Sequence, residues 1–560
     1  MTPAVDIHVD CFRQIMIWPL QLHPINHDAS LESVQIDEVT NLLEKSDWKW
    51  ADRDGGTKAT QLKDLPGYGA DNEFDYSEIV YFHSYVRDFL YGGDRKKPDK
   101  RSMRVLRRTD IEWLCIDLDE HRKYQLKVER LEAYLFQTGV LLIVVEVEDP
   151  MPQEVKDPMP QEVEDPKPQK EKPDFFLSLK DAMDLQNKMR MVFPRRWDDK
   201  GVPSETPLRA AWLDSEGKLL KESEQNYATK TDFTEIVRDN AELPAAKHWR
   251  YLLKDFPLYG EDKSNEEDKS NKYAIKQIED QRIPSMTYLA VPDPREISEW
   301  DFARIAFYDS AGESSVGSYS DQFLKDWDKK SAYDRFWQRT PSTGDAEGVL
   351  KHNNQMRTRW LCSGYGLAVV GATADSFYTN QIAANFRHHY FRMGLIAHFQ
   401  RASLLTFRDQ LAEATEKSGS RFRDEVMKIQ SNVTKFRARF WFHEVSTQLQ
   451  GQEIFALWTD RLGNRAMFDQ VTSDIAAAES QLRTEMEAAE AKRINTIAEI
   501  GGSLAVFGLL VAVAALFVSI CTATWQLSFP AMVFIFAGVF SLPVLLAWKL
   551  LRFLHSHKPD

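Results

Sequence analysis

One stretch near the end of the chain carries no charged residue. From Ile500 to Trp548 there are 49 consecutive positions without Asp, Glu, Lys or Arg. Because an α-helix rises 1.5 Å per residue, about 20 residues cross a hydrocarbon core of about 30 Å. The stretch is long enough for two spans, which we place at about 500–520 and 531–551. The alternative is a buried helical hairpin in a soluble core, but a charge-free stretch of this length is rare in water-soluble folds.

Basic residues flank these spans and predict their orientation. Lys492 and Arg493 precede the first span, and Lys549, Arg552 and Lys558 close or follow the second. The connecting turn has no basic residue. Because cytoplasmic flanks carry the excess of Lys and Arg, we expect both termini in the cytoplasm and the turn outside. The sequence thus predicts a multi-pass protein of the cell's inner (plasma) membrane.

The composition of the whole chain limits its partners. The 560 residues include 71 Lys+Arg and 85 Asp+Glu, which gives a formal charge of −14. Nucleic-acid binders usually show a basic surplus, so we expect no nucleic-acid partner. Four Cys in 560 residues are too few for a disulfide scaffold, and they form no CxxC pair, which argues against a cysteine zinc site. The first residues lack a basic region followed by an apolar core, so we expect no secretory signal.

Composition and periodicity divide the chain into segments. The octapeptide at 149–156 is nearly repeated at 157–164, and seven prolines between 149 and 174 predict a solvated linker. Short β-branched runs predict an α/β fold on both sides of it, whereas 376–501 lacks Pro and has helical periodicity. The fold class is therefore a cytoplasmic α/β domain followed by a helical stalk and a C-terminal two-helix transmembrane hairpin. The segments are 1–148, the first cytoplasmic α/β segment; 149–174, Pro-rich linker; 175–375, the second cytoplasmic α/β segment; 376–466, helical region; 467–520, stalk helix continuing into the first span; 521–530, outer turn; 531–551, second span; and 552–560, basic cytoplasmic tail.

Local patterns predict individual elements. Strands are expected at 111–118, 140–147, 286–291 and 360–370. The run 126–136 is interpreted as a short helix, and 178–191 as a helix with Ser178 as its N-cap. A further helix is predicted from six apolar residues with heptad spacing, which we expect to form one buried seam. These residues are Phe422, Val426, Ile429, Val433, Phe436 and Phe440.

The first predicted span carries a stripe of small residues spaced alternately by four and three positions. Small residues let helices approach closely in lipid, where apolar burial contributes little to association. Larger residues such as Leu504, Phe507, Val511 and Val518 fall off the stripe and can meet lipid. Two interpretations stay open, packing between the two spans and a face toward the pore or axis of a symmetric oligomer. The stripe consists of Gly501, Ala505, Gly508, Ala512, Ala515, Ser519 and Thr522.

Other motifs carry little weight for function. The tetrapeptide 363–366 contains the Gly-Tyr-Gly of a potassium filter, but it stands far before the first span, within a predicted soluble strand. The histidines at 388, 389 and 398 lack the i, i+4 spacing of a helical metal site. The sequence also lacks the phosphate-loop, dinucleotide-loop and nucleophile-elbow motifs. We therefore expect no enzyme activity and no catalytic residue.

The order of segments resembles the CorA-type magnesium and cobalt transporter family. Three local segments are similar to it: Tyr134–Val140 to its cytoplasmic sheet, Phe440–Gly451 to the helical part of large relatives, and Lys492–Ile500 to the approach to the first span. The resemblance implies a homo-oligomer, a pentamer, in the lipid bilayer. It also implies that Mg²⁺ or another divalent cation is the transported or regulatory ion, with no other cofactor, and that the cytoplasmic domain is the gate.

One departure from the family affects its ion selectivity. The family's Gly-Met-Asn signature at the outer end of the first span is replaced here by Ser519–Thr524. The signature Asn binds a hydrated cation, so magnesium selectivity does not carry over. At the outer mouth, oxygens of Thr522, Thr524 and Gln526 remain for a hydrated cation, together with Ser519. Two functions stay open: a CorA-like cation channel gated by its cytoplasmic domain, and a non-transporting membrane-anchored sensor or effector whose cytoplasmic domain binds a ligand or protein.

Overall fold

The computed structural model describes most of the chain up to Trp525 and a few positions after it. Contacts divide the chain into two units, Met1–Ile475 and Ala476–Asp560, which are taken separately below. The described residues are 7–24, 36–43, 46–50, 80–91, 102–149, 177–224, 245–256, 273–310, 318–339 and 357–525, with single positions at 530, 533, 534, 538, 541, 545 and 549.

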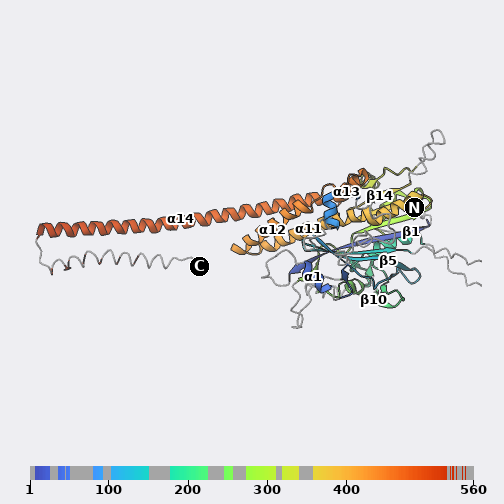
Figure 1. Ribbon diagram of the computed structural model, residues 1–560, viewed down its shortest axis with the longest axis horizontal. Helices are drawn as coiled ribbons and strands as arrows, with labels where there is room; N and C mark the ends of the chain where they lie inside the picture. The colour runs from blue at the N-terminus through green and yellow to red at the C-terminus, as the bar shows by residue number, and fades with distance from the viewer. Residues whose placement is uncertain are drawn as a thin grey trace, which may run out of the picture. The chain divides into compact units, whose positions relative to one another are not determined.

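A mixed sheet forms the centre of the first unit (Figure 1). Within the described residues it has 13 strands, paired antiparallel except for β12 and β15, which run parallel. Strands from 1–148 and from 175–375 join this one sheet. The order across it is β10 (Leu219–Glu224), β9 (Arg209–Leu213), β4 (Trp113–Asp117), β5 (Lys123–Phe136), β6 (Val140–Glu148), β1 (Cys11–Pro24), β12 (Ser285–Val291), β15 (Gly366–Ala372), β14 (Arg359–Cys362) and β13 (Ala332–Tyr333). Beside this path, β11 (Tyr273–Gln277) pairs with β1, and β3 (Met103–Arg107) pairs with β5 and with β2 (Lys49–Trp50), while β7 (Arg196–Trp197) and β8 (Pro203–Ser204) form a separate pair.

The structure confirms three of the predicted strands and corrects two other predictions. The runs 111–118, 140–147 and 286–291 coincide with β4, β6 and β12 to within two residues at each end. The predicted helix at 126–136 is wrong, because this run belongs to β5. Its second half is buried on both faces, so its apolar residues are nearly continuous and show neither period clearly. The predicted strand 360–370 is two strands, since Gly364 adopts φ 90° and turns the chain between β14 and β15.

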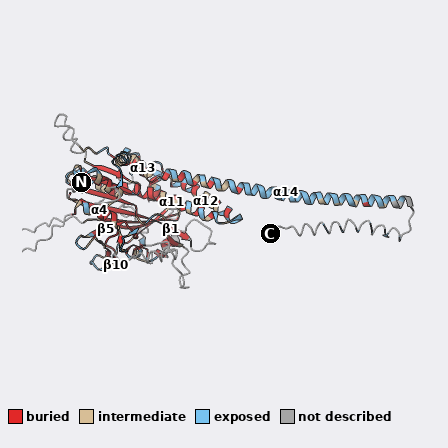
Figure 2. Cartoon of the chain, turned by 180° about the vertical axis from the view of Figure 1, so that it is seen from behind, coloured by how far each residue is buried: buried red, intermediate tan, exposed pale blue. Residues whose placement is uncertain are grey.

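Helices cover both faces of the sheet, and the buried residues lie between the layers (Figure 2). Residues of α1 (Ile36–Leu43), α4 (Leu179–Met189), α6 (Lys247–Leu252) and α7 (Glu299–Phe307) share one apolar cluster with alternate residues of β1. On the opposite face, Phe399 of α11 (Phe391–Thr415) stacks on Phe136 of β5, with ring centroids 4.1 Å apart. The remaining short helices of this unit are α3 (Ser84–Tyr91), η6 (Pro294–Glu296), α8 (Asp321–Ser331), η8 (Phe377–Ile382), α10 (Ala383–Asn385) and η9 (Phe386–Tyr390).

Two helix predictions in the first unit are confirmed by contacts. The Ser178 hydroxyl accepts a hydrogen bond from the Asp181 amide at 3.1 Å, so it caps α4 as expected. The heptad seam lies on α12 (Gly419–Arg439), where its first five residues are buried, and Phe440 is buried just beyond the helix end. α13 (Leu449–Arg461) then leads to the last helix.

The last helix, α14, runs without interruption from Asn464 to Trp525. Its 62 residues correspond to about 93 Å at 1.5 Å per residue. It contains the predicted stalk and first span, 467–520, and extends five residues into the predicted outer turn. Among the described residues it is the one helix that is long and apolar enough to cross a membrane, with a mean hydropathy of 2.6 over its most apolar 18 residues.

The chain thus combines an N-terminal mixed α/β domain with a long, apolar C-terminal helix. The predicted second span at 531–551 lies mostly outside the described residues, and the basic tail at 552–560 entirely so. The same holds for the Pro-rich linker after Asp149. The two-helix hairpin and the linker therefore stay predictions.

Candidate functional site

The small-residue stripe lies on an exposed face of α14. Gly501, Ala505, Gly508, Ala512, Ala515 and Ser519 are all exposed in the single chain. A Cβ atom added at Gly501 or Gly508 would meet no other atom within 4 Å. Along the described part of the apolar segment, this face is therefore accessible to another helix.

A different side of α14 is covered. Phe507, Val511 and Val518 are half-buried and Ala514 is buried, whereas Leu504 is 64% exposed. With 3.6 residues per turn, the covered positions lie about a quarter to a third of a turn away from the stripe. That Phe507, Val511 and Val518 can meet lipid therefore stays a prediction. The size of a residue indicates whether another helix can approach it closely. It does not indicate which side of the helix is covered in the folded chain.

The predicted outer mouth is described only in part. The exposed Ser519 hydroxyl donates a hydrogen bond to the Ala515 carbonyl of the preceding turn, at 2.9 Å. Thr522 and Thr524 lie in the last turns of α14, where the structure describes the backbone, and Gln526 lies outside the described residues. The oxygens expected to meet a hydrated cation therefore stay a prediction.

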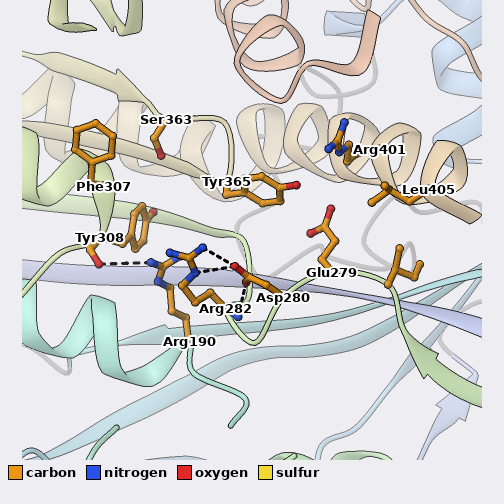
Figure 3. A pocket seen from close by; sticks show the side chains of 11 residues that line it. Arg190, Glu279, Asp280, Arg282, Phe307, Tyr308, Ser363, Tyr365, Arg401 and Leu405 are labelled. Atoms are coloured by element: carbon orange, nitrogen blue, oxygen red, sulfur yellow. Dashed lines mark hydrogen bonds and ion pairs between the residues drawn. The ribbon is translucent and has the colours of Figure 1, made fainter. Parts of the chain in front are cut away.

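A cavity of about 410 Å³ opens in the first unit, where the parallel strands β12 and β15 begin (Figure 3). The end of α4, the segment before β12, the end of α7, the β14–β15 turn and α11 supply its walls. No sequence pattern indicates this cavity, because its residues are scattered over more than 200 positions and form no local motif. The lining residues are Arg190, Ile278, Glu279, Asp280, Arg282, Phe307, Tyr308, Ser363, Tyr365, Arg401 and Leu405.

Arg190 is the most deeply buried charged group of this cavity. It follows α4, and only 5% of its surface is exposed. Its guanidinium lies over the Tyr308 ring, 5.0 Å from the centroid, and its Nη2 donates a hydrogen bond to the Tyr308 carbonyl oxygen at 3.5 Å (Figure 3). Its Nε has no hydrogen-bond partner among the described residues. Among the described residues, no carboxylate forms a salt bridge with it. Burial, followed by repulsion from Arg282, lowers the pKa of Arg190 to about 10, so it remains charged at neutral pH.

The opposite wall joins Glu279, Tyr365 and Arg401. Burial raises the pKa of Glu279 to about 8, although the charge of Arg401 acts in the opposite direction. The carboxyl is therefore mostly protonated at neutral pH. The Tyr365 hydroxyl interacts with both Glu279 and Arg401, and the three side chains point toward one another in Figure 3. Glu279 Oε2 and Arg401 Nε have no hydrogen-bond partner. The wall thus presents donors in excess of acceptors.

Two glycines hold the turn that carries Ser363 and Tyr365. A Cβ at Gly366 would collide with the Tyr308 ring, and one at Gly364 would lie 2.7 Å from the Arg461 carbonyl oxygen. The Gly364 carbonyl accepts a hydrogen bond from Trp458 Nε1 of α13 at 2.9 Å. Gly364 and Tyr365 therefore form a tight turn packed on α13, where a continuous strand was expected, and Gly366 begins β15.

A second polar cluster lies between the sheet and η9, and its contacts are internal. Glu146 is fully buried, with Arg387 Nε at 2.8 Å and Arg130 Nε at 3.1 Å from its oxygens. Burial alone would raise the pKa of Glu146, but these arginines, with Arg13, lower it to about 2. The cluster joins β1, β5 and β6 to η9, so we assign it a structural role.

The histidines singled out in the sequence do not converge on a metal. His389 and His398 are buried, and the His398 ring packs edge-on against Trp458 with centroids 5.8 Å apart. Burial lowers the pKa of His398 to about 3. In the part of the chain that the structure describes, no group of three or more His, Cys, Asp or Glu side chains is arranged to hold a metal ion.

No family model, curated protein or solved structure matches the chain. Any function must therefore be argued from two features of the molecule itself. One is the open stripe of small residues on α14, and the other is the positively charged cavity of the α/β domain.

Proposed function

We propose that the chain forms a homo-oligomeric, CorA-like cation channel of the inner membrane, gated by its cytoplasmic α/β domain. The observation that carries the proposal is the exposed stripe from Gly501 to Ser519 on the apolar part of α14. Several copies, five in the proposed assembly, direct this stripe toward a common axis. Small side chains there let the helices approach closely and still leave a lumen.

The transported ion in this proposal is a hydrated divalent cation such as Mg²⁺. Magnesium dehydrates reluctantly, so outer-shell contacts with hydroxyl and amide oxygens suit it. Ser519, Thr522, Thr524 and Gln526 supply such oxygens at the outer end. No covalent chemistry is involved, and the proposal requires only further copies of the chain and a bilayer.

The proposed gate uses the continuity of α14. The helix begins directly after α13, at the edge of the α/β domain, and has no break before the apolar segment. A change in the domain at the start of the helix is therefore passed along one hydrogen-bonded element. This is the route by which we expect the cytoplasmic domain to control conduction.

Ion flux into liposomes tests the proposal. The purified full-length protein is reconstituted and challenged with Mg²⁺, Co²⁺, Zn²⁺ and monovalent cations. Saturable flux of a divalent cation is expected, and Ser519→Ala changes its rate or ion preference while the oligomer survives. Absence of flux for all ions, in protein shown to be folded and oligomeric, contradicts the channel.

The topology is tested separately by cysteine labelling. In intact cells, with the native Cys521 of the outer turn replaced by Cys521→Ser, an impermeant thiol reagent is expected to modify the Gln526→Cys variant and to spare the Ser556→Cys variant. The reason is that basic residues flank the spans and are missing from the turn. The reverse pattern of labelling rules out a hairpin with both ends in the cytoplasm.

A membrane-anchored sensor is the second candidate, and the cavity beside β12 favours it. A buried, unpaired Arg190 is the kind of group that a soluble ligand neutralises. In this case the α/β domain binds the ligand and α14 serves as an anchor. Folded, oligomeric protein without flux, together with ligand binding in the cavity, supports this candidate over the channel.

A further inference from the structure

The cavity beside β12 and β15 contains positive charge that its own acidic residues do not neutralise. Arg282 is paired, since its Nε donates to Asp280 at 2.9 Å. Arg190 is buried and forms no salt bridge with any described residue, and Arg401 faces the largely protonated Glu279. Among the residues that the structure describes, these two guanidinium groups thus have no ionised carboxylate within salt-bridge distance.

Burying an unpaired charge is unfavourable unless something else stabilises it. The folded domain nevertheless places Arg190 in a cavity instead of in a packed core. Guanidinium groups match carboxylate and phosphate oxygens because two parallel N–H donors meet two acceptors. The unpaired nitrogens of Arg190 and Arg401 are therefore suited to such an anion.

We propose that this cavity binds a small organic oxyanion, a phosphate or carboxylate carried on an apolar or aromatic body. Arg190 and Arg401 neutralise its charge. The Ser363 hydroxyl, which here donates to the Gly366 carbonyl at 3.4 Å, turns to donate to the anion, and the Tyr365 hydroxyl donates a second hydrogen bond. The protonated Glu279 supplies a further donor and no repulsion. Phe307 forms an apolar wall, and about 410 Å³ lies in the range of pockets that hold small organic ligands.

This binding is independent of transport, because all lining residues belong to the first unit. Only an effect of the ligand on ion flux rests on the proposed channel function. A binding assay can therefore fail or succeed without reference to flux, and the two proposals are tested apart.

Isothermal titration calorimetry on the full-length protein in detergent provides the test. The probes are AMP, inorganic phosphate and benzoate, with adenosine as the uncharged control. At least one of the oxyanion probes is expected to bind, and adenosine is not. Arg401→Gln is expected to weaken binding about 10-fold or more, since a hydrogen bond to a charged group is lost. Arg408→Gln, an exposed position on the same helix, is expected to leave affinity unchanged.

Tyr365→Phe serves as a second variant in case Arg401→Gln does not fold. Its side chain is 38% exposed, so the loss of one hydroxyl leaves the core intact, and a several-fold weaker binding is expected. Binding of AMP and phosphate without benzoate assigns the phosphate class, and the converse assigns the carboxylate class. Failure of all three oxyanions at millimolar concentration overturns the proposal. Binding that neither variant weakens also overturns it.

Discussion

Glu146 illustrates how strongly one buried carboxylate depends on its partners. It has no exposed surface and contacts two arginines from β5 and η9. Removing one member of a buried ion pair leaves the other charges unpaired, which typically costs about 3–5 kcal/mol. We therefore expect Glu146→Gln to lower the free energy of unfolding by about this amount, as measured by denaturant titration. Asp424→Asn, at an exposed position of α12, is the control and is expected to change stability little. Equal effects of the two variants would contradict the structural role of the cluster.

The buried carboxyl of Glu279 is expected to make the stability of the protein depend on pH. Burial raises the folded-state pKa of Glu279 to about 8, whereas the ordinary pKa of 4.5 applies to the unfolded chain. The stabilisation from holding this proton in the folded state is therefore fully present below pH 4.5. This contribution is lost as the pH rises from 4.5 through 8. Glu279→Gln is therefore expected to flatten the fall in melting temperature between about pH 5 and about pH 9. Unchanged pH dependence in the variant would show that the carboxyl is not buried as described.

The same residue links pH to ligand binding. The charged and titratable groups around Glu279 are Arg401 and Tyr365 on one side and Asp280 next to it in the chain. Arg190 and Arg282 complete the polar lining of the cavity. Ionisation of Glu279 adds a negative charge, so oxyanion affinity is expected to fall as the pH rises through 8. In Glu279→Gln this fall is expected to be much smaller, which calorimetry at two pH values can measure.

Sequence patterns found few of these polar residues. Arg190 lies in the last turn of the predicted helix 178–191, where the sequence suggests an ordinary solvated cation, because the end of a helix is a favourable place for a positive charge. Its burial depends on Tyr308 and Arg282, which stand about 90 to 120 residues away. Local patterns report periodicity and caps, but a cavity forms from long-range packing.

At the scale of elements, prediction succeeded where one face of a regular pattern is buried. The heptad seam of α12 and the Ser178 cap of α4 both depend on residues within the same helix. The prediction for β5 failed because a strand buried on both faces loses the alternation that identifies strands. The β14–β15 turn was also missed, although Gly364 and Gly366 were the signal that could have revealed it.

Close packing of α11 on α13 gives a prediction at this scale. A Cβ at Gly394 of α11 would collide with the Trp458 indole of α13. We expect Gly394→Ala to destabilise the protein by about 1–3 kcal/mol, because overpacking forces side chains or backbone to shift. Thermal unfolding of the full-length protein measures the loss.

Two comparisons make this prediction specific. Gly502→Ala, at a helical position where a Cβ meets no atom, is expected to be neutral or stabilising. Combining Gly394→Ala with Trp458→Phe is expected to cost less than the sum of the single changes, since the smaller ring leaves room for the methyl group. Strict additivity would show that the indole is not the source of the strain.

The exposure of individual residues on α14 allows matched variants to test whether the stripe of small residues packs against other copies of the chain. Gly508→Leu and Ala512→Leu place large side chains on the stripe, whereas Val506→Leu and Val513→Leu lie on an exposed side about a third of a turn away from its centre. The first pair is expected to disturb assembly or block flux through overpacking of about 1–3 kcal/mol. The second pair is expected to be nearly silent, because lipid tails are as apolar as Leu.

Size-exclusion chromatography in detergent and liposome flux report these two outcomes. Val506 and Val513 are chosen as controls because they are exposed. Val511 and Val518 also lie off the stripe but are half-buried, so a larger side chain there could disturb packing. If Gly508→Leu and Val513→Leu behave alike in both assays, the stripe neither faces an axis nor packs against a neighbouring chain.

Because α14 is unbroken, the number of residues between the α/β domain and the stripe determines the direction in which the stripe faces. Each residue turns the helix by about 100° and advances it by 1.5 Å, so one Ala inserted within the exposed segment 484–498 rotates everything beyond it by about 100°. Seven inserted residues return the angle to within about 20° while moving the span by about 10 Å. If function requires a fixed rotation of the stripe relative to the start of α14, the variant with seven inserted residues conducts ions in liposomes and the variant with one inserted residue does not. Equal flux from both would mean that the ends are torsionally uncoupled.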